Sequence, residues 1–483
     1  MPPWACAMES FSPFLPTRLG EDPKFFFAPW IEAESQSRAP RELPPGTKGH
    51  VILTGYDAIS MALVEKLKDY KRGYVVICED FKRALELYDT GGPMAVGNID
   101  DRETYRKLRV ENASLVVATQ RDEINTNITL MVREVDEKVP IITTAESPYS
   151  MDILSLAGSS KVLQIYDILG RSLAGWTMAG DCRANIIGRF DGLVIAEFPA
   201  AGTPLVGKTI AESKLRENMG VTVVGIWKRG NLHIPVPGTV ISRTNILVLA
   251  GSAEAMSSYE EVYFFYHICK QAGDPVLIVG GGRVGNTIAE RFKEREIPYL
   301  IIEKNPRKAQ EAESYVLGDA ANIETLKKAW IEKAPAALIT THDDATNIYL
   351  TKYLRSLRPD MQIISRANLD RNVSTLHRAG ADFVMSYSSL GANAIFNFLE
   401  KEDALMLAEG LTLFHLKAPA SLVGKSLTLS RIREETGCSV VALRVNGVLS
   451  INPDPNVAIG ENAELILMGS LEGERKFLRV FGV

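Results

Sequence analysis

The residues best suited to chemistry form a glycine-rich turn in the second half of the chain. Gly280, Gly282 and Gly285 have the spacing G-x-G-x-x-G, directly after an apolar run at residues 276–279. Glycines at this spacing let the backbone bend sharply and approach a pyrophosphate, while the first N–H groups of the following helix point at the phosphates. The turn therefore predicts a site for a dinucleotide or another adenine nucleotide.

An acidic residue stands where such a site needs one. Glu303 directly follows the next apolar run, at residues 299–302. At the end of that strand a carboxylate accepts hydrogen bonds from the ribose hydroxyls of an adenine nucleotide, and it repels a 2'-phosphate. Glu303 thus favours NAD or an adenosine nucleotide over NADP, although the neighbouring Lys304 and Arg307 weaken that preference.

Further candidates follow the third, fourth and fifth apolar runs, where the carboxyl edge of an open parallel sheet binds ligands. Residues 318–320 and 340–344 either contact the ligand or serve as loops and helix caps. Arg366 either reaches a phosphate or pairs with an acid of its own loop. The expected binding set is Gly280, Gly282, Arg283, Val284, Gly285, Glu303, Gly318, Asp319, Ala320, Thr340 and Arg366.

The first half of the chain carries a degenerate version of the same turn. Gly55 remains, but Tyr56 and Asp57 place bulk and negative charge where a pyrophosphate would approach the backbone. Glu79 still occupies the position after the second strand. We therefore expect no dinucleotide here; this half is either a structural or dimerising unit, or binds a cation or a nucleoside without a pyrophosphate.

These motifs belong to an internal repeat with an offset of about 220 residues. Each half begins with short Val/Ile/Leu runs that alternate with amphipathic segments, which predicts a Rossmann-like, doubly wound parallel sheet. Each half ends in short strands with Gly and Pro turns, which predicts a small β-rich subdomain. The expected organisation is an N-terminal segment, 1–48; a first doubly wound domain, 49–185; its β subdomain, 186–257; a second doubly wound domain, 274–405; and its β subdomain, 406–483.

Composition excludes several other classes of protein. The 483 residues are 46% hydrophobic with a net charge of -5, and no block of Lys and Arg indicates nucleic-acid binding. Five dispersed cysteines and six dispersed histidines predict neither a disulfide framework nor a metal site. There is no apolar run of about 18 residues and no signal peptide. No catalytic residues are expected.

Several motifs occur together: residues 280–285 with Glu303, 318–320, 344–347, 365–366, and the pair 205–209 and 422–426. In this combination the chain, over residues 46 to 483, resembles the regulators of potassium conductance, the tandem RCK proteins built from TrkA-N and TrkA-C domains. Residues 25–33 and 38–44 are similar to the exit of an inner pore helix and its linker, although no pore helix or selectivity filter precedes them.

The resemblance implies a nucleotide-sensing regulator of potassium transport. Its expected ligand is NAD(H), with ATP or ADP as the alternative. Its expected partners are further copies of itself, in a symmetric ring such as a tetramer or a dimer of dimers, and the pore of a potassium channel or transporter. It would act in the cytoplasm at the inner face of the membrane. The pore would lie outside this chain, which would be a truncated channel, a separate subunit or a chain with a misassigned start.

Two other functions remain open. The dinucleotide fold also serves NAD-dependent oxidoreductases. The tandem arrangement and the missing catalytic domain argue against an enzyme. A purely structural assembly module would bind no ligand, and the intact glycine turn argues against that.

Overall fold

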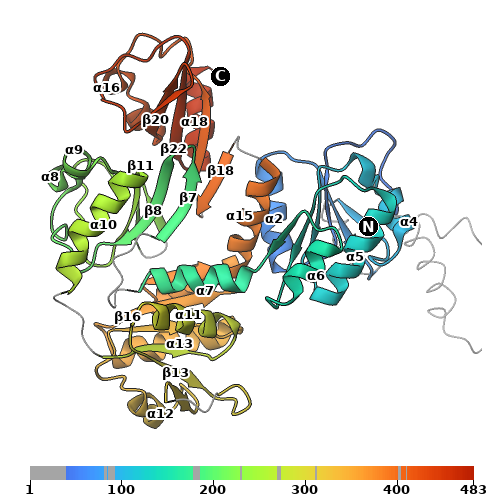
Figure 1. Ribbon diagram of the computed structural model, residues 1–483, viewed down its shortest axis with the longest axis horizontal. Helices are drawn as coiled ribbons and strands as arrows, with labels where there is room; N and C mark the ends of the chain where they lie inside the picture. Colours follow the sequence, from blue (N-terminus) through green and yellow to red (C-terminus); the bar gives the residue numbers. More distant parts are fainter. Residues whose placement is uncertain are drawn as a thin grey trace, which may run out of the picture.

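The computed structural model describes residues 40–80, 84, 93–177, 185–228, 231–268, 274–309, 313–400, 404–408 and 411–482. It contains two six-stranded parallel sheets and two five-stranded antiparallel sheets (Figure 1). The predicted duplication of a Rossmann-like unit with a β subdomain is confirmed. The pore-exit-like residues 25–33 lie outside the described part of the chain.

The first parallel sheet has the strand order β3-β2-β1-β4-β5-β6. Its central strands are runs of Val, Ile and Leu that are buried on both faces, as a sheet covered by helices requires. Its strands are β1 (Val51–Leu53), β2 (Tyr74–Cys78), β3 (Met94–Val96), β4 (Leu115–Ala118), β5 (Ile141–Thr144) and β6 (Lys161–Leu163). Its helices are α2 (Ala58–Asp69), α4 (Arg102–Lys107), η2 (Val110–Asn112), α5 (Asp122–Val135), α6 (Ser150–Leu156) and α7 (Ile165–Gly175).

The second parallel sheet repeats this topology, in the order β14-β13-β12-β15-β16-β17. Its strands are β12 (Val276–Val279), β13 (Tyr299–Glu303), β14 (Tyr315–Leu317), β15 (Ala336–Ile339), β16 (Gln362–Ala367) and β17 (Phe383–Ser386). Its helices are α11 (Arg283–Glu294), α12 (Ile323–Lys328), α13 (Asp344–Leu357), η3 (Asp370–Asn372), α14 (Val373–Ala379) and α15 (Tyr387–Glu400).

The two antiparallel sheets also share one topology, β10-β9-β11-β8-β7 and β21-β20-β22-β19-β18. The first subdomain comprises β7 (Asn185–Phe190), β8 (Leu193–Pro199), α8 (Ile210–Ser213), α9 (Leu215–Met219), β9 (Thr222–Lys228), β10 (Asn231–His233), β11 (Ile246–Ser252) and α10 (Ala253–Ile268). The second comprises β18 (Ala404–Ala408), β19 (Leu411–Lys417), α16 (Leu427–Ser430), α17 (Ile432–Thr436), β20 (Ser439–Val445), β21 (Val448–Ile451), β22 (Ala463–Gly469) and α18 (Leu471–Phe481).

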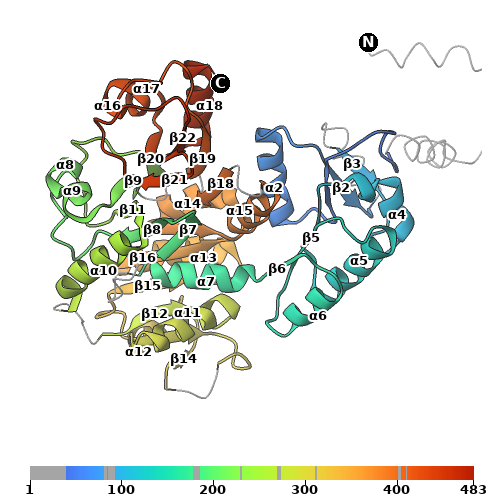
Figure 2. The same ribbon diagram turned by 45° about the horizontal axis from the view of Figure 1, so that its top comes forward.

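The two copies exchange their last helices. Helix α7 leaves the first parallel sheet and packs on α11 of the second copy, whereas α15 leaves the second sheet and packs on α2 of the first (Figures 1 and 2). Gly170 of α7 and Gly391 of α15 hold equivalent positions at these contacts, and both lack the side chain that would separate the helices. The exchange ties the two copies together at their glycine turns.

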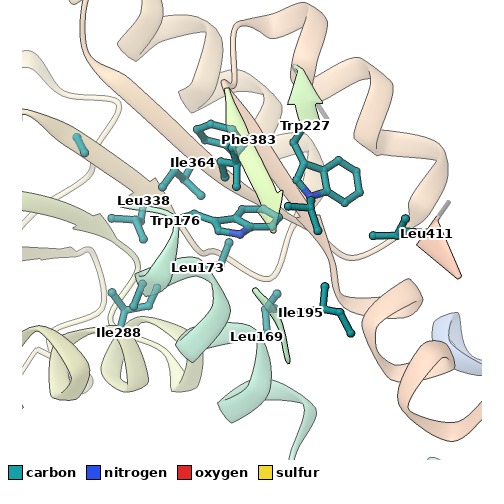
Figure 3. Close-up of a cluster of buried hydrophobic side chains, with 14 of the residues drawn as sticks. Leu169, Leu173, Trp176, Ile195, Trp227, Ile288, Leu338, Ile364, Phe383 and Leu411 are labelled. Carbon is teal, nitrogen blue, oxygen red and sulfur yellow. The ribbon is translucent and has the colours of Figure 1, made fainter. Parts of the chain in front are cut away.

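A single apolar cluster joins α7 to the second parallel sheet and to both subdomains. It brings Leu169 and Leu173 of α7 next to Ile288 of α11, and it continues to Leu411 in β19 (Figure 3). Within it, Glu197 is 2% exposed and accepts hydrogen bonds from the indole N–H groups of Trp176, at 2.6 Å, and Trp227, at 2.8 Å. This paired carboxylate fixes the end of α7 on the first subdomain.

Polar contacts join the two subdomains. The Thr222 hydroxyl donates to Asn452 Oδ1 at 2.7 Å, and the Arg433 guanidinium donates to the carbonyl oxygen of Pro235 at 2.6 Å. A matching bond runs from Arg216 to the carbonyl oxygen of Pro453. In the part of the chain that the structure describes, no helix has the length and apolarity needed to cross a bilayer.

Candidate nucleotide-binding site

A cavity of about 1010 Å³ opens at the carboxyl ends of the strands of the second parallel sheet. It is bordered by the turn after β12, the end of β13, the turn after β14, the loop after β15 and the end of β16. Of the eleven residues predicted from the sequence, ten line it and Gly285 does not. The ten are Gly280, Gly282, Arg283, Val284, Glu303, Gly318, Asp319, Ala320, Thr340 and Arg366.

The three glycines of the turn have different tasks. Gly280 adopts φ +107°, which side-chain-bearing residues rarely adopt. Gly282 is the N-cap of α11 without a side-chain cap, and a Cβ there would meet no atom within 4 Å, so the first N–H groups of α11 stay open to a phosphate. A Cβ on Gly285 would lie 2.0 Å from the carbonyl oxygen of Gly280, so Gly285 allows the helix to pack closely on the turn.

Glu303 is fixed by the backbone around it. It is 8% exposed, and its Oε2 accepts from the N–H of Gly281 while its Oε1 accepts from the N–H of Asn305, both at 2.8 Å. Each carboxylate oxygen keeps a further lone pair for a ribose hydroxyl. Lys304 and Lys308 line the cavity nearby, whereas Arg307 is not among its lining residues.

The turn after β14 and the residue after β15 also serve the local structure. The Thr340 hydroxyl donates to the carbonyl oxygens of Val279 and Gly280 at 3.1 Å, which supports the glycine turn. Asp319 accepts from the N–H of Ala321 at 2.8 Å. These residues thus stabilise their own loops and also line the cavity, where their contact with a ligand stays a prediction.

Arg366 is the buried cation of the site. It is 5% exposed, and its Nε is buried without a hydrogen-bond partner among the described residues. Burial lowers the pKa of its guanidinium. Its side chain hydrogen-bonds to two neutral groups, the Asn368 amide of its own loop and the Tyr166 hydroxyl, which stand in place of the acid partner considered from the sequence.

The first copy contributes residues that the sequence did not reveal. Tyr166, at the start of the exchanged helix α7, lines the cavity, and the Arg283 guanidinium carbon lies 4.7 Å from its ring centroid. Arg283 also pairs with Glu146 of the first copy at 2.9 Å. In the sequence, nothing at position 166 indicates a ligand contact. The one available signal is that the equivalent position of the second copy, Tyr387, is also a tyrosine. Thr341, His342 and Asp343, which belong to the stretch 340–344 considered from the sequence, also line the cavity. Further lining residues that the sequence did not single out include Asn286, Asn305 and Lys308.

In the first copy the equivalent position is already filled. The Asp57 carboxylate caps α2 and accepts from the N–H groups of Ile59, at 2.8 Å, and Ser60, at 3.0 Å. The Thr119 hydroxyl donates to the same carboxylate. A carboxylate of the chain thus holds the N–H groups that a phosphate would need.

A smaller cavity of about 540 Å³ remains in the first copy. It is lined by Glu79, Gly97 and Asn98, together with the cations Arg41 and Lys107. Among the described residues, no group of three or more His, Cys, Asp and Glu side chains is placed to hold a metal ion.

Comparison with known proteins agrees with this geometry. The TrkA-N domain model matches residues 51–165 and 276–387, and the TrkA-C domain model matches residues 193–262. The crystal structure of the GsuK RCK domain is 35% identical, with a TM-score of 0.68, and covers 94% of this chain and 99% of that one. The chain belongs to the RCK domain family. Both parallel units are thus TrkA-N copies, and the second one holds the open glycine turn.

Two further relatives carry names that bear on function. The structure of the GsuK channel bound to NAD is 35% identical with a TM-score of 0.68, and covers 95% of this chain and 83% of that one. Potassium channel protein 1 of Methanocaldococcus jannaschii is 28% identical over 224 residues, which are 44% of this chain and 67% of that protein. The RCK chain therefore spans about two thirds of the length of this curated relative.

Proposed function

We propose that this chain is a nucleotide-sensing regulator of potassium transport, which binds NAD(H), ATP or ADP in its second TrkA-N copy. One contrast carries the proposal: Gly282 leaves the N-terminus of α11 open, whereas Asp57 closes the N-terminus of α2. The open turn lies in the cavity with buried Glu303, as an adenine nucleotide requires. The expected stoichiometry is one nucleotide per chain.

The arrangement of the copies supports a regulatory role. Tyr166 and the Arg283–Glu146 pair place groups of the first copy at the nucleotide cavity of the second. A ligand that contacts both copies stabilises the arrangement in which these groups meet. It shifts the conformational equilibrium by its difference in affinity for the two arrangements.

The names of the relatives support the partners that we propose. GsuK and the archaeal relative are named as channels, so the proposed partner is the pore of a potassium channel or transporter. In this role several copies form a symmetric ring at the inner face of the membrane. The role requires no catalytic residue, and the absence of NADH-dependent hydride transfer to a panel of carbonyl substrates would distinguish it from that of an oxidoreductase.

The test uses Gly282→Asp, which copies the first turn into the second. The new carboxylate has room and is expected to cap α11 as Asp57 caps α2, so the free energy of unfolding stays equal or rises by a few tenths of a kcal/mol. Calorimetry should show that the affinity for NAD, NADH, ATP and ADP falls more than tenfold. Gly282→Ala adds a Cβ without a charge and is the matched control, with a smaller loss.

The same variant tests the link to transport. Potassium flux should lose its response to nucleotide in cells that carry Gly282→Asp in place of the wild-type chain. If the purified wild-type chain shows no saturable binding of these nucleotides, and the flux is unchanged by Gly282→Asp, the proposal is wrong.

A further inference from the structure

Arg366 is a buried cation that lines the nucleotide cavity, and one of its donor atoms, Nε, has no partner among the described residues. It is 5% exposed, lines the cavity together with the glycine turn, and its Nε finds no acceptor among the described residues. A buried donor without a partner costs free energy. A bound acceptor at this end of the cavity would remove that cost.

The charge of Arg366 is also left without a directly bonded acid. The carboxylate of Asp344 acts on it from a distance, but its oxygens accept from the N–H groups of Asn368 and Leu369, at 2.7 and 3.1 Å, and from the Asn372 side chain, at 2.7 Å. No ion pair joins Arg366 to an acid within the described residues. An external anion is the group that this site lacks.

Two tyrosines hold the guanidinium in place. The rings of Tyr166 and Tyr387 stack with their centroids 4.9 Å apart, and the guanidinium carbon of Arg366 lies 5.4 and 5.3 Å from them. Cations are attracted to such ring faces. Tyr166 comes from the first copy and Tyr387 from the second, so the position of Arg366 depends on both copies.

The strand order indicates which part of a ligand lies near Arg366. A pyrophosphate binds at the N-terminus of α11, beyond β12, and β16 lies two strands from β12. At the usual strand spacing this is a separation of about 10 Å. Past the pyrophosphate, NAD⁺ has a ribose and a positively charged nicotinamide ring, whereas ATP has a third phosphate. A guanidinium binds a phosphate in a bidentate manner and repels a cation.

We propose that Arg366 binds the terminal phosphate of adenosine triphosphate, and that Tyr166 of the first copy positions the Arg366 guanidinium for this contact. The inference rests on the proposed function, because it names the preferred nucleotide of the same cavity. It makes ATP a better ligand than NAD⁺, and it makes the preference depend on the contact between the copies.

The experiment is calorimetry on the full chain with ATP, ADP and NAD⁺. Arg366→Gln should lower the affinity for ATP at least tenfold and that for ADP less than threefold, and should leave the affinity for NAD⁺ unchanged or higher. Arg366→Lys, which keeps the charge, should recover part of the ATP affinity. Arg371→Gln, which removes an exposed arginine in the following turn, is the control and should change none of the three nucleotide affinities.

The role of Tyr166 has its own readout, the ratio of ATP to ADP affinity. Tyr166→Ala should lower this ratio most, while Tyr166→Phe, which keeps the aromatic face but loses the hydroxyl that bonds to Arg366, should retain part of it. These variants and Arg366→Lys also test the inference if Arg366→Gln does not fold. Parallel losses for all three nucleotides would overturn it and make Arg366 structural. Absence of any binding to the wild-type chain would instead count against the proposed function.

Discussion

Asp57 and Gly282 stand at the same point of the repeat and differ by one carboxylate. In the first copy that carboxylate accepts the N–H groups of Ile59 and Ser60, while in the second copy the same groups of α11 stay open. The sequence predicted that Tyr56 and Asp57 make the first turn unsuited to a pyrophosphate, because that depends on local charge and bulk. It did not predict that Asp57 itself occupies the position of the phosphate, since a cap is recognised only once the helix start is known.

A second feature at the residue scale is the partly buried carboxyl of Glu474 in α18. Burial raises its pKa, the Glu400 carboxylate adds to the rise, and Arg475 opposes it. Its Oε2 has no hydrogen-bond partner among the described residues. Because the folded state favours the neutral form, stability is lost as the pH rises from the unfolded pKa through the folded one.

Glu474→Gln should therefore raise the urea midpoint of unfolding, because the raised pKa of the wild-type carboxyl costs stability as the pH rises. The gain should be larger at pH 7.5 than at pH 4.5. Glu472→Gln, at an exposed position two residues earlier in the helix, is the control and should show no such trend. An equal gain at both pH values would mean that the charge is not its cause.

At the scale of elements, the strands could be predicted and the exchange of helices could not. Runs such as residues 276–279 are buried on both faces, so composition alone identifies them as strands of a covered parallel sheet. The apolar face of α7 shows only that this helix is buried. Whether it packs on its own copy or on α11 is decided by long-range fit, which leaves no mark in a single sequence. Tyr166 was missed for the same reason.

The two exchanged helices provide a matched pair of variants. A Cβ on Gly170 would lie 2.7 Å from Thr287 Cβ and 3.1 Å from the carbonyl oxygen of Val284, which are rigid parts of α11. A Cβ on Gly391 would lie 2.9 Å from Cδ1 and Cγ1 of Ile59, and its three nearest atoms are all side-chain atoms with no backbone atom among them. The gain in helix propensity from alanine, about 1 kcal/mol, is the same at both sites and cancels in the comparison.

Gly170→Ala should thus destabilise the chain by about 1–3 kcal/mol relative to Gly391→Ala, as overpacking does. It should also weaken nucleotide binding, because it displaces the first turn of α11, whereas Gly391→Ala leaves that turn untouched. Chemical denaturation and calorimetry measure the two effects. Equal behaviour of the two variants would show that the contact of α7 with α11 is more plastic than its distances imply.

At the scale of the whole molecule, an apolar surface on the first copy indicates where copies of the chain meet. Tyr149, Ile153 and Leu156 on and beside α6 are 88%, 55% and 87% exposed, and Leu130 of the neighbouring α5 is 46% exposed. The equivalent positions of the second copy to Tyr149 and Leu156 are Arg371 and Arg378. The repeat has therefore kept the fold while making this face apolar in one copy only, and we expect this face to be a contact surface between copies.

Replacing Ile153 and Leu156 by Glu should disperse the assembly that the proposed ring requires. Each carboxylate would have to lose its hydration in the contact, and such burial without a partner is strongly unfavourable. Light scattering should show a wild-type mass above the 53.1 kDa of one chain and a lower mass for the double variant. Val448→Glu, at a 72% exposed position on β21, introduces the same charge away from this surface and should leave the mass unchanged. Because the nucleotide cavity lies in the second copy, the dispersed variant should still bind one nucleotide per chain, which separates assembly from ligand binding. A double variant that keeps the wild-type mass would show that the copies meet at another surface.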